Sequence, residues 1–149
     1  MQSSQQEAVF AMFASWKRGE VELAPVTGLL EITPVEIGEG RAALEMDAGK
    51  AHHNVFGTVH GGLLCAFADV AMGVALAATL NNEGFTTLHQ QMDHVRGIAE
   101  SRLLASAEVT HRGRRIGHLR CAISDDKDRL IAEASSVCLI SELEAGVSD

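Results

Sequence analysis

The chain has 149 residues, 46% of them hydrophobic, which is enough for one domain of ordinary size with a buried core. Its formal net charge of -8 argues against nucleic-acid binding, because proteins that bind nucleic acids present a basic surface to the phosphates. The three cysteines lie in apolar surroundings without metal-like spacing, and no signal peptide is evident at the start. Both features indicate reduced thiols in a cytoplasmic protein.

The first predicted elements are one helix and two strands. Apolar residues recur at helical spacing over residues 4–18, and Gly19 ends that helix. Residues 27–37 and 41–46 read as strands, and the turn between them, at 38–40, contains two glycines. The two strands are therefore predicted to form a hairpin.

A long apolar helix is predicted over residues 60–80, after a structured loop at 47–59. Residues 63–80 are long enough to be considered as a membrane span, but Asp69 lies in the middle of them. A central Asp costs about 2.5–3.5 kcal/mol on insertion scales, and the Ala and Gly residues around it contribute little. The segment is therefore predicted to be a buried helix rather than a membrane span.

Three or four strands are predicted after the central helix, with candidates at residues 86–95, 103–109, 117–123 and 130–140. Alternation of apolar and polar residues gives such strands one buried face each. A helix that is apolar on all sides has to be covered, and a curved antiparallel sheet of five or six strands can cover it. The predicted fold class is α+β, with a curved antiparallel sheet wrapped around one long central helix.

The residues around the start of this helix suggest acyl-transfer chemistry. His60-Gly61-Gly62 opens the helix, where unpaired N–H groups and the helix dipole suit a developing oxyanion. Asn54 adds an amide, and Asp69 is a carboxylate that could act as nucleophile or general base. From the residues alone, Asp69 could instead be a structural acceptor or face solvent, and the glycines could form only a tight turn. The nearby histidines lack the partners of a metal site.

Asn54, Gly57, His60-Gly61-Gly62 and Asp69 form the pattern N-x-x-G-x-x-H-G-G-x-x-x-x-x-x-D. With the order of elements, this pattern resembles the hotdog-fold thioesterases of the PaaI-like (phenylacetate-degradation) group. The resemblance covers residues 25–141, leaving 1–24 as an N-terminal helix with its lead-in and 142–149 as a C-terminal tail. It implies hydrolysis of acyl-coenzyme A (acyl-CoA) thioesters without metal or cofactor, by homodimers that usually assemble into homotetramers.

The resemblance also implies roles for individual residues. Asp69 matches the catalytic carboxylate, and Gly61 matches the glycine whose N–H polarises the thioester carbonyl. Asn54 and His60 match the pair that positions the thioester and water. Thr87 falls where relatives carry a Ser or Thr that holds the attacking water, although the neighbouring Thr86 is an alternative.

The spacing of Gly61 and Asp69 has a consequence that does not depend on the family. Eight residues of helix separate them by about 12 Å along its axis, so one thioester carbon cannot contact both. Either one of these residues is irrelevant, or the glycine and the carboxylate come from different subunits. The dimer of the family favours the second explanation, with Asp69 facing a subunit interface.

Further residues are candidates for substrate binding. Arg112, Arg114 and Arg115 form a basic cluster that is either a solvated turn or a contact for the coenzyme A phosphates. Gly62 allows a substrate to approach the backbone closely. Phe56, Phe67 and Met72 could line the pocket, although a position in the core is favoured for each of them. Two other functions remain open: acyl-CoA binding without turnover, and a hotdog dehydratase or hydratase.

Overall fold

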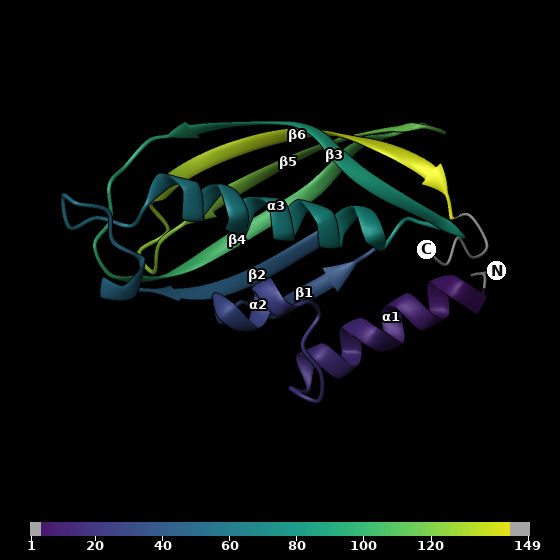
Figure 1. Ribbon diagram of the computed structural model, residues 1–149, viewed down its shortest axis with the longest axis horizontal. Coiled ribbons are helices and arrows are strands. Elements are labelled where there is room, and N and C mark those ends of the chain that lie inside the picture. Colours follow the sequence, from purple (N-terminus) through teal and green to yellow (C-terminus); the bar gives the residue numbers. More distant parts are fainter. Residues whose placement is uncertain (1–3, 144–149) are drawn as a thin grey trace, which may run out of the picture.

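The computed structural model describes residues 4–143, so most of the predicted C-terminal tail at 142–149 lies outside the described residues. Two helices precede the sheet: α1 at Ser4–Lys17 and α2 at Pro25–Leu29. Helix α1 follows the prediction, buries Phe13 and Trp16, and packs against the first strand (Figure 1).

Helix α2 corrects the prediction of a strand beginning at residue 27. Pro25 occupies the first helical turn, where its fixed φ angle is favourable and its missing N–H costs nothing. The buried Thr27 donates its hydroxyl to the Ala24 carbonyl at 2.7 Å and accepts the Ala24 N–H at 3.2 Å. These contacts close a helical turn, and the strand therefore begins only at Thr33.

The six strands form one antiparallel sheet. They are β1 Thr33–Gly38, β2 Arg41–Ala48, β3 Glu83–His94, β4 Ser101–Arg112, β5 Ile116–Ser124 and β6 Leu130–Glu142. Their order across the sheet is β1-β2-β4-β5-β6-β3. The predicted hairpin at 38–40 is confirmed, with Gly40 at a φ of 70° that favours glycine. The four later strands are also confirmed, each slightly longer than predicted.

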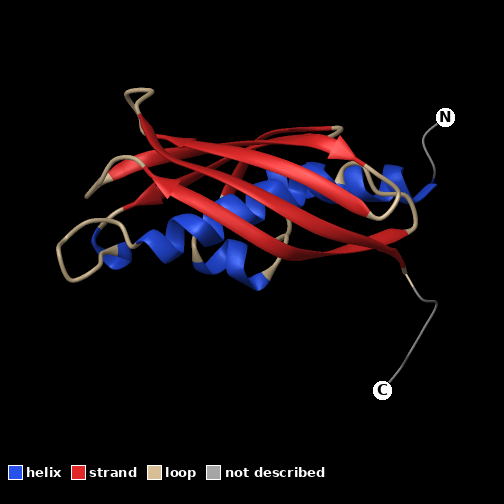
Figure 2. Ribbon diagram, turned by 90° about the horizontal axis from the view of Figure 1, so that it is seen from above, coloured by secondary structure: helices blue, strands red, loops and turns tan. Residues whose placement is uncertain are grey.

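Helix α3, Gly61–Ala77, lies along the inside of the curved sheet (Figures 1 and 2). One side of it is buried in the core through large residues such as Leu64, Phe67, Met72 and Leu76. The predicted curved sheet wrapped around the helix is confirmed, and the side of the helix that carries Asp69 is left partly open in the single chain. Gly73 does mark a close approach, because an added Cβ would lie 3.2 Å from the Phe85 ring.

Strand β3 is an edge of the sheet, and within residues 4–143 it pairs with β6 alone. It is long for an edge strand, with 12 residues. Leu88 and Val95, at and just beyond this strand, are exposed by 58% and 56%. Long edge strands with exposed apolar residues are ready to pair with another chain.

The turn between β5 and β6 is organised by Asp125, whose side chain is buried. Its carboxylate accepts the N–H groups of Lys127 and Arg129, at 3.0 and 2.9 Å, and the Nε of Arg129 at 2.7 Å. Burial alone would raise the pKa of this carboxyl. The hydrogen bonds and charge of Arg129, with the Lys127 N–H, outweigh burial and lower the pKa to about 2.

Candidate active site

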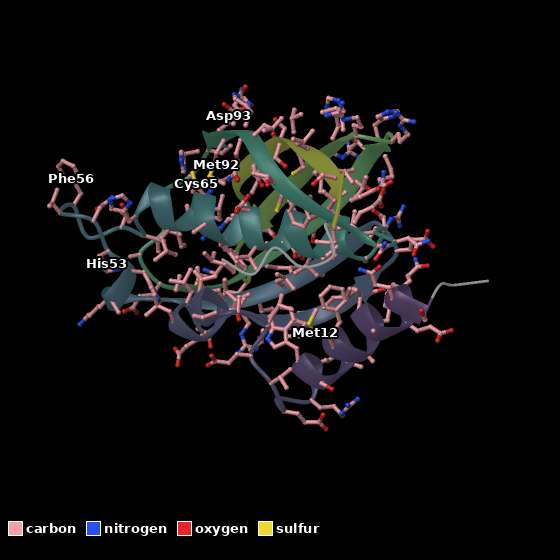
Figure 3. The ribbon with its side chains drawn as sticks, turned by 45° about the vertical axis from the view of Figure 1, so that its right-hand side comes forward. Met12, His53, Phe56, Cys65, Met92 and Asp93 are labelled. Carbon is pink, nitrogen blue, oxygen red and sulfur yellow. The ribbon has the colours of Figure 1, made fainter. Side chains whose placement is uncertain are left out.

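A stripe of residues on α3 faces β3 and contains the predicted catalytic carboxylate. Its members recur every fourth position, which places them on one face of the helix. They are Gly61, Cys65, Asp69 and Gly73, and they lie in order against His94, Met92, Thr87 and Phe85. Figure 3 shows Cys65 beside Met92 at this seam. We call these residues the α3–β3 seam.

Asp69 lies in the middle of the seam and is exposed in the single chain. Its Oδ1 accepts a hydrogen bond from Thr87 Oγ1 at 3.2 Å. Thr86 is exposed and precedes Thr87 on the strand, so its side chain points to the other face of the sheet. Of the two threonines, Thr87 is therefore the one that contacts the carboxylate.

The start of α3 offers an unpaired N–H group. His60 is the N-cap, and its Nδ1 accepts the Gly62 N–H at 3.0 Å. In the neutral ring the proton is then on Nε2. Within residues 4–143, the Gly61 N–H has no acceptor. This N–H and the positive end of the helix dipole can receive a carbonyl oxygen that becomes negative.

Asn54 organises the loop that leads to α3. Its Oδ1 accepts the N–H groups of Phe56 and Thr58, at 2.9 and 3.3 Å, and its Nδ2 donates to Thr58 Oγ1 at 3.0 Å. One hydrogen of Nδ2 is left for another acceptor. A contact between Asn54 and substrate therefore depends on this second hydrogen.

The apolar candidates for the pocket divide into two groups. Phe67 and Met72 are buried in the core, as favoured from the sequence. Phe56 is 88% exposed at the outer tip of its loop, so the core position favoured for it is wrong (Figure 3). Phe56 and the adjacent Val55 can contact substrate or a second subunit, since both project from the single chain.

Gly61 and Asp69 belong to one continuous helix, as the prediction requires. They are therefore about 12 Å apart along the helix axis. Both lie on the seam, next to the edge strand β3. A single chain therefore separates these two candidate site residues by about two helical turns.

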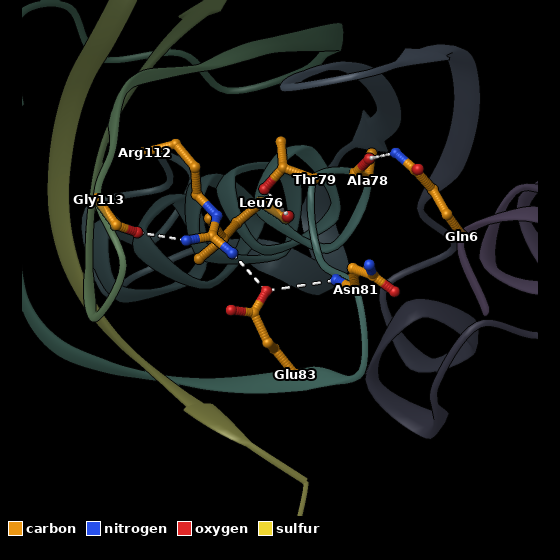
Figure 4. A network of polar contacts seen from close by, with 8 residues as sticks. All are labelled: Gln6, Leu76, Ala78, Thr79, Asn81, Glu83, Arg112 and Gly113. Atoms are coloured by element: carbon orange, nitrogen blue, oxygen red, sulfur yellow. Dashed lines mark hydrogen bonds and ion pairs between the residues drawn. The ribbon is translucent and has the colours of Figure 1, made fainter. Parts of the chain in front are cut away.

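The basic cluster is divided by the structure. Arg112 forms a half-buried ion pair with Glu83 and donates to the Gly113 carbonyl (Figure 4). Its guanidinium is thus committed within the chain, which favours a structural role for Arg112. Arg114 and Arg115 are exposed in the β4–β5 turn. A phosphate contact therefore rests mainly on these two residues.

Three further observations bear on the kind of site. Among residues 4–143, no three His, Cys, Asp or Glu side chains are grouped to hold a metal ion, and no helix has the length and hydropathy of a membrane span. Cys65, Cys121 and Cys138 are free thiols, and burial raises the pKa of Cys121 to about 12. A hollow of about 810 Å³ lies on the sheet face away from α3, and its lining includes none of the predicted site residues.

His94 is a neighbour of the site that the sequence analysis missed. Its ring lies against Gly61, within 3.1–3.7 Å of the position of an added Cβ. No sequence motif marks this residue, since the contact depends on how β3 runs back along α3. The order of helix and following strand was the available signal: a strand antiparallel to the helix has to end near the start of that helix.

The sequence profile of the Thioesterase superfamily matches residues 56–132, which include the start of α3 and the whole seam. Over 112 residues the chain is 31% identical to Rv1847 of Mycobacterium tuberculosis, a protein named as an esterase. That alignment covers 72% of this chain and 80% of Rv1847. The chain belongs to the thioesterase superfamily. Thioester hydrolysis is therefore its general chemistry.

Solved structures agree with this membership. The structure of Rv1847 matches this chain with a TM-score of 0.78 and 28% identity. The match covers 82% of this chain and 100% of Rv1847. A structure from Ralstonia eutropha, named as a thioesterase related to phenylacetic acid degradation, matches with a TM-score of 0.77 and 27% identity. This match covers 85% of this chain and 98% of the other. E. coli PaaI gives 0.77 at 22% identity, covering 87% and 93%, which supports the fold alone. The predicted hotdog fold is confirmed.

Proposed function

We propose that this thioesterase hydrolyses acyl-CoA thioesters at two equivalent sites between the subunits of a homodimer. Each site combines the Gly61 N–H of one subunit with Asp69 of the partner subunit. The observation that carries the proposal is the seam itself. It presents an exposed carboxylate and an unpaired N–H on one helix face, too far apart to act on the same carbonyl group.

The edge strand supports pairing along the same side of the molecule. β3 has one edge without a partner strand in the described chain, and exposed Leu88 and Val95 lie at this edge. Joining β3 to β3 of a second copy would extend the sheet antiparallel by two-fold symmetry. The two α3 helices would then lie side by side in opposite directions, which brings the start of each toward Asp69 of the other.

The proposed reaction begins with the thioester carbonyl on the Gly61 N–H. His60 and the second Nδ2 hydrogen of Asn54 position the thioester and water. Asp69 of the partner subunit either attacks the carbonyl carbon, expelling the thiolate and forming an anhydride, or removes a proton from an attacking water. Thr87 donates a hydrogen bond to this carboxylate and holds its orientation. Single turnover in labelled water separates the two routes, because only an anhydride route can place label in Asp69.

Other parts of the proposal concern the setting of the enzyme. Arg114 and Arg115 bind the coenzyme A phosphates, since guanidinium groups match phosphate geometry and both are exposed. Dimers pair further into a homotetramer. The free thiols fit a reducing compartment such as the cytoplasm.

The test is a thiol-release assay with a panel of acyl-CoA thioesters, comparing wild type with Asp69→Asn and Asp69→Ala. We expect wild type to release thiol and both variants to lose at least about 100-fold in kcat, as is typical when a catalytic base or nucleophile is removed. Because Asp69 is exposed in the single chain, both variants should keep the fold of the wild-type subunit, which circular dichroism checks. Turnover by Asp69→Asn within a few-fold of wild type would contradict the mechanism. Binding of acyl-CoA without thiol release by wild type would indicate a non-catalytic binding protein.

A further inference from the structure

The first residue of α3 lies against a histidine that has no role in the reaction proposed above. A Cβ on Gly61 would be 3.1 Å from Cε1 and 3.3 Å from Nε2 of His94. These separations are closer than ordinary van der Waals contact between carbon atoms. Glycine at position 61 therefore allows the imidazole ring to lie directly over the start of the helix.

The ring of His94 lies beside the Cβ position of Gly61, at the end of the helix out of which the Gly61 N–H points. In an α-helix each Cα–Cβ bond tilts toward the N-terminus, and the first N–H groups also point out of that end. A ring beside the Cβ position of Gly61 is consequently beside any oxygen that the Gly61 N–H binds. A carbonyl oxygen there is within reach of an imidazole N–H.

The backbone at the helix start leaves room for a second donor. The Gly62 N–H is taken by His60 Nδ1 at 3.0 Å, and the N–H groups of Leu63 and Leu64 donate to the His60 carbonyl. Gly61 thus offers the one unpaired N–H among these four residues, within the described chain. A developing oxyanion has lone pairs for more than one donor, so an added donor stabilises it further.

His94 is available for this role. Its ring nitrogens have no hydrogen-bond partner within residues 4–143, and the residue is exposed at the end of β3. The histidines of the preceding loop are placed differently: His53 Nε2 bonds the Ala99 carbonyl at 2.7 Å, and His52 Nδ1 accepts the Gly49 N–H at 3.1 Å, which leaves the donor of His52 on Nε2. Of these three histidines, His94 is the one whose ring lies against Gly61.

We infer that His94 donates a second hydrogen bond to the thioester carbonyl oxygen, next to the Gly61 N–H of the same subunit. This inference rests on the function proposed above. As the nucleophile adds, the carbonyl π pair moves onto oxygen, and it returns as the carbon–sulfur bond breaks and the thiolate leaves. His94 keeps its proton throughout, and its N–H stabilises the charge between the two events.

The test compares His94→Phe, which keeps a ring of similar size without a donor, with His94→Gln, which keeps an N–H donor. His118→Phe is the control, since His118 is an exposed histidine of β5, away from the proposed subunit interface. We expect His94→Phe to lose roughly 100-fold or more in kcat, as when an oxyanion-hole donor is removed, with KM within a few-fold. His94→Gln should stay within about tenfold of wild type, and His118→Phe should equal wild type.

A second measurement separates donation to the carbonyl from shaping of the site. An S-alkyl-CoA thioether, in which CH₂ replaces the carbonyl, should bind wild type and His94→Phe with the same Kd. A kcat for His94→Phe equal to that of His118→Phe would overturn the inference. So would an equal loss in His94→Gln and His94→Phe, or a matching loss of thioether binding.

Failure of the inference and failure of the proposed function give different results. If wild type releases thiol, Asp69→Asn does not, and His94→Phe keeps full activity, the inference about His94 alone is wrong. If wild type releases no thiol from any acyl-CoA, the proposed function is wrong, and so is the inferred role of His94.

Discussion

At the scale of the residue, the pair formed by Asp69 and Thr87 depends on one hydrogen bond. The bond of 3.2 Å joins a helix residue to a strand residue, and it fixes one oxygen of a carboxylate that is otherwise exposed. An unfixed carboxylate rotates between several positions, and only some of them aim an oxygen at a bound thioester or water. We therefore expect Thr87 to act on the proposed reaction through the orientation of Asp69.

Replacing Thr87 with Val tests this role, since Val keeps the shape and removes the hydroxyl. We predict that Thr87→Val lowers kcat roughly tenfold, which corresponds to about 1.4 kcal/mol in the barrier, while KM changes little. Steady-state thiol release measures both quantities. Thr86→Val is the control and should behave as wild type, because Thr86 points to the other face of the sheet. Equal losses in both variants would show that Thr87 does not act through Asp69.

The site residues that were predictable from the sequence are those carried by the spaced pattern around α3. His60, Gly61 and Asp69 occupy positions on the helix that follow from its period, so their placement required no tertiary information. For the strand residue next to Asp69, the sequence allowed either Thr86 or Thr87. The two are adjacent, and which of them faces the helix depends on the register of the strand. No motif marks His94, so its contact with Gly61 could have been inferred only from the direction in which β3 runs back along α3.

At the scale of the element, the β4–β5 hairpin combines two kinds of arginine. Arg112 is held by Glu83 at the start of β3 and by the Gly113 carbonyl, whereas Arg114 and Arg115 project into solvent. Sequence proximity grouped the three residues because it cannot distinguish a paired guanidinium from a free one. The same limit explains α2: a local Thr27–Ala24 contact overrode the strand-like composition of residues 27–37.

The two kinds of arginine should respond differently to substitution by Ala. We predict that Arg112→Ala lowers the free energy of unfolding by about 1.5–3 kcal/mol, because Glu83 is left half-buried without its partner. Arg114→Ala should leave stability nearly unchanged and raise KM for acyl-CoA, but not for a pantetheine thioester that lacks the nucleotide. Denaturant unfolding and kinetics with the two substrates check both expectations. An equal rise in KM for both substrates would contradict a phosphate contact.

The β5–β6 turn makes a prediction about acid stability. Asp125 has a pKa of about 2 in the folded chain, below its ordinary value of 3.8. A carboxyl whose pKa is lowered by folding stabilises the fold above its unfolded pKa, and that contribution is lost as pH falls through the folded value. We therefore predict that Asp125→Asn destabilises the protein at pH 7 and that the difference from wild type shrinks between about pH 4 and pH 2.

Melting temperatures measured across this range check the prediction for Asp125. Asp126→Asn is the matched control, because Asp126 is the exposed neighbour in the same turn. It should melt close to wild type at every pH. A deficit of Asp125→Asn that stayed constant down to pH 2 would contradict a role for the charged carboxylate.

At the scale of the whole molecule, the proposed site is a property of two chains. Asn54→Ala damages the half that contains the loop and the helix start, and Asp69→Asn damages the half that contains the carboxylate. Each homodimer then has a lesion in both of its sites. In a mixed dimer, one site collects both lesions and the other collects none.

Subunit exchange between these two variants should therefore restore activity. Random exchange makes half of the dimers mixed, and one of two sites in each is intact, so we predict recovery to about a quarter of wild-type activity. Native mass spectrometry confirms the exchange, and thiol release measures the recovery. Mixing Asp69→Asn with Asp69→Ala is the control and should restore nothing. Flat activity after confirmed exchange would show that each site lies within one subunit.

The edge of β3 that lacks a partner strand in the described chain has a consequence for the solubility of this protein. An exposed, partly apolar strand is a template for uncontrolled assembly, and a newly folded chain presents one beside Asp69. If a second copy covers that edge, the dimerisation that completes the proposed active site also buries this aggregation-prone strand. Substitutions that weaken the pairing of β3 would then reduce solubility and turnover together. Selection against insoluble chains would preserve the catalytic interface even while substrate is absent.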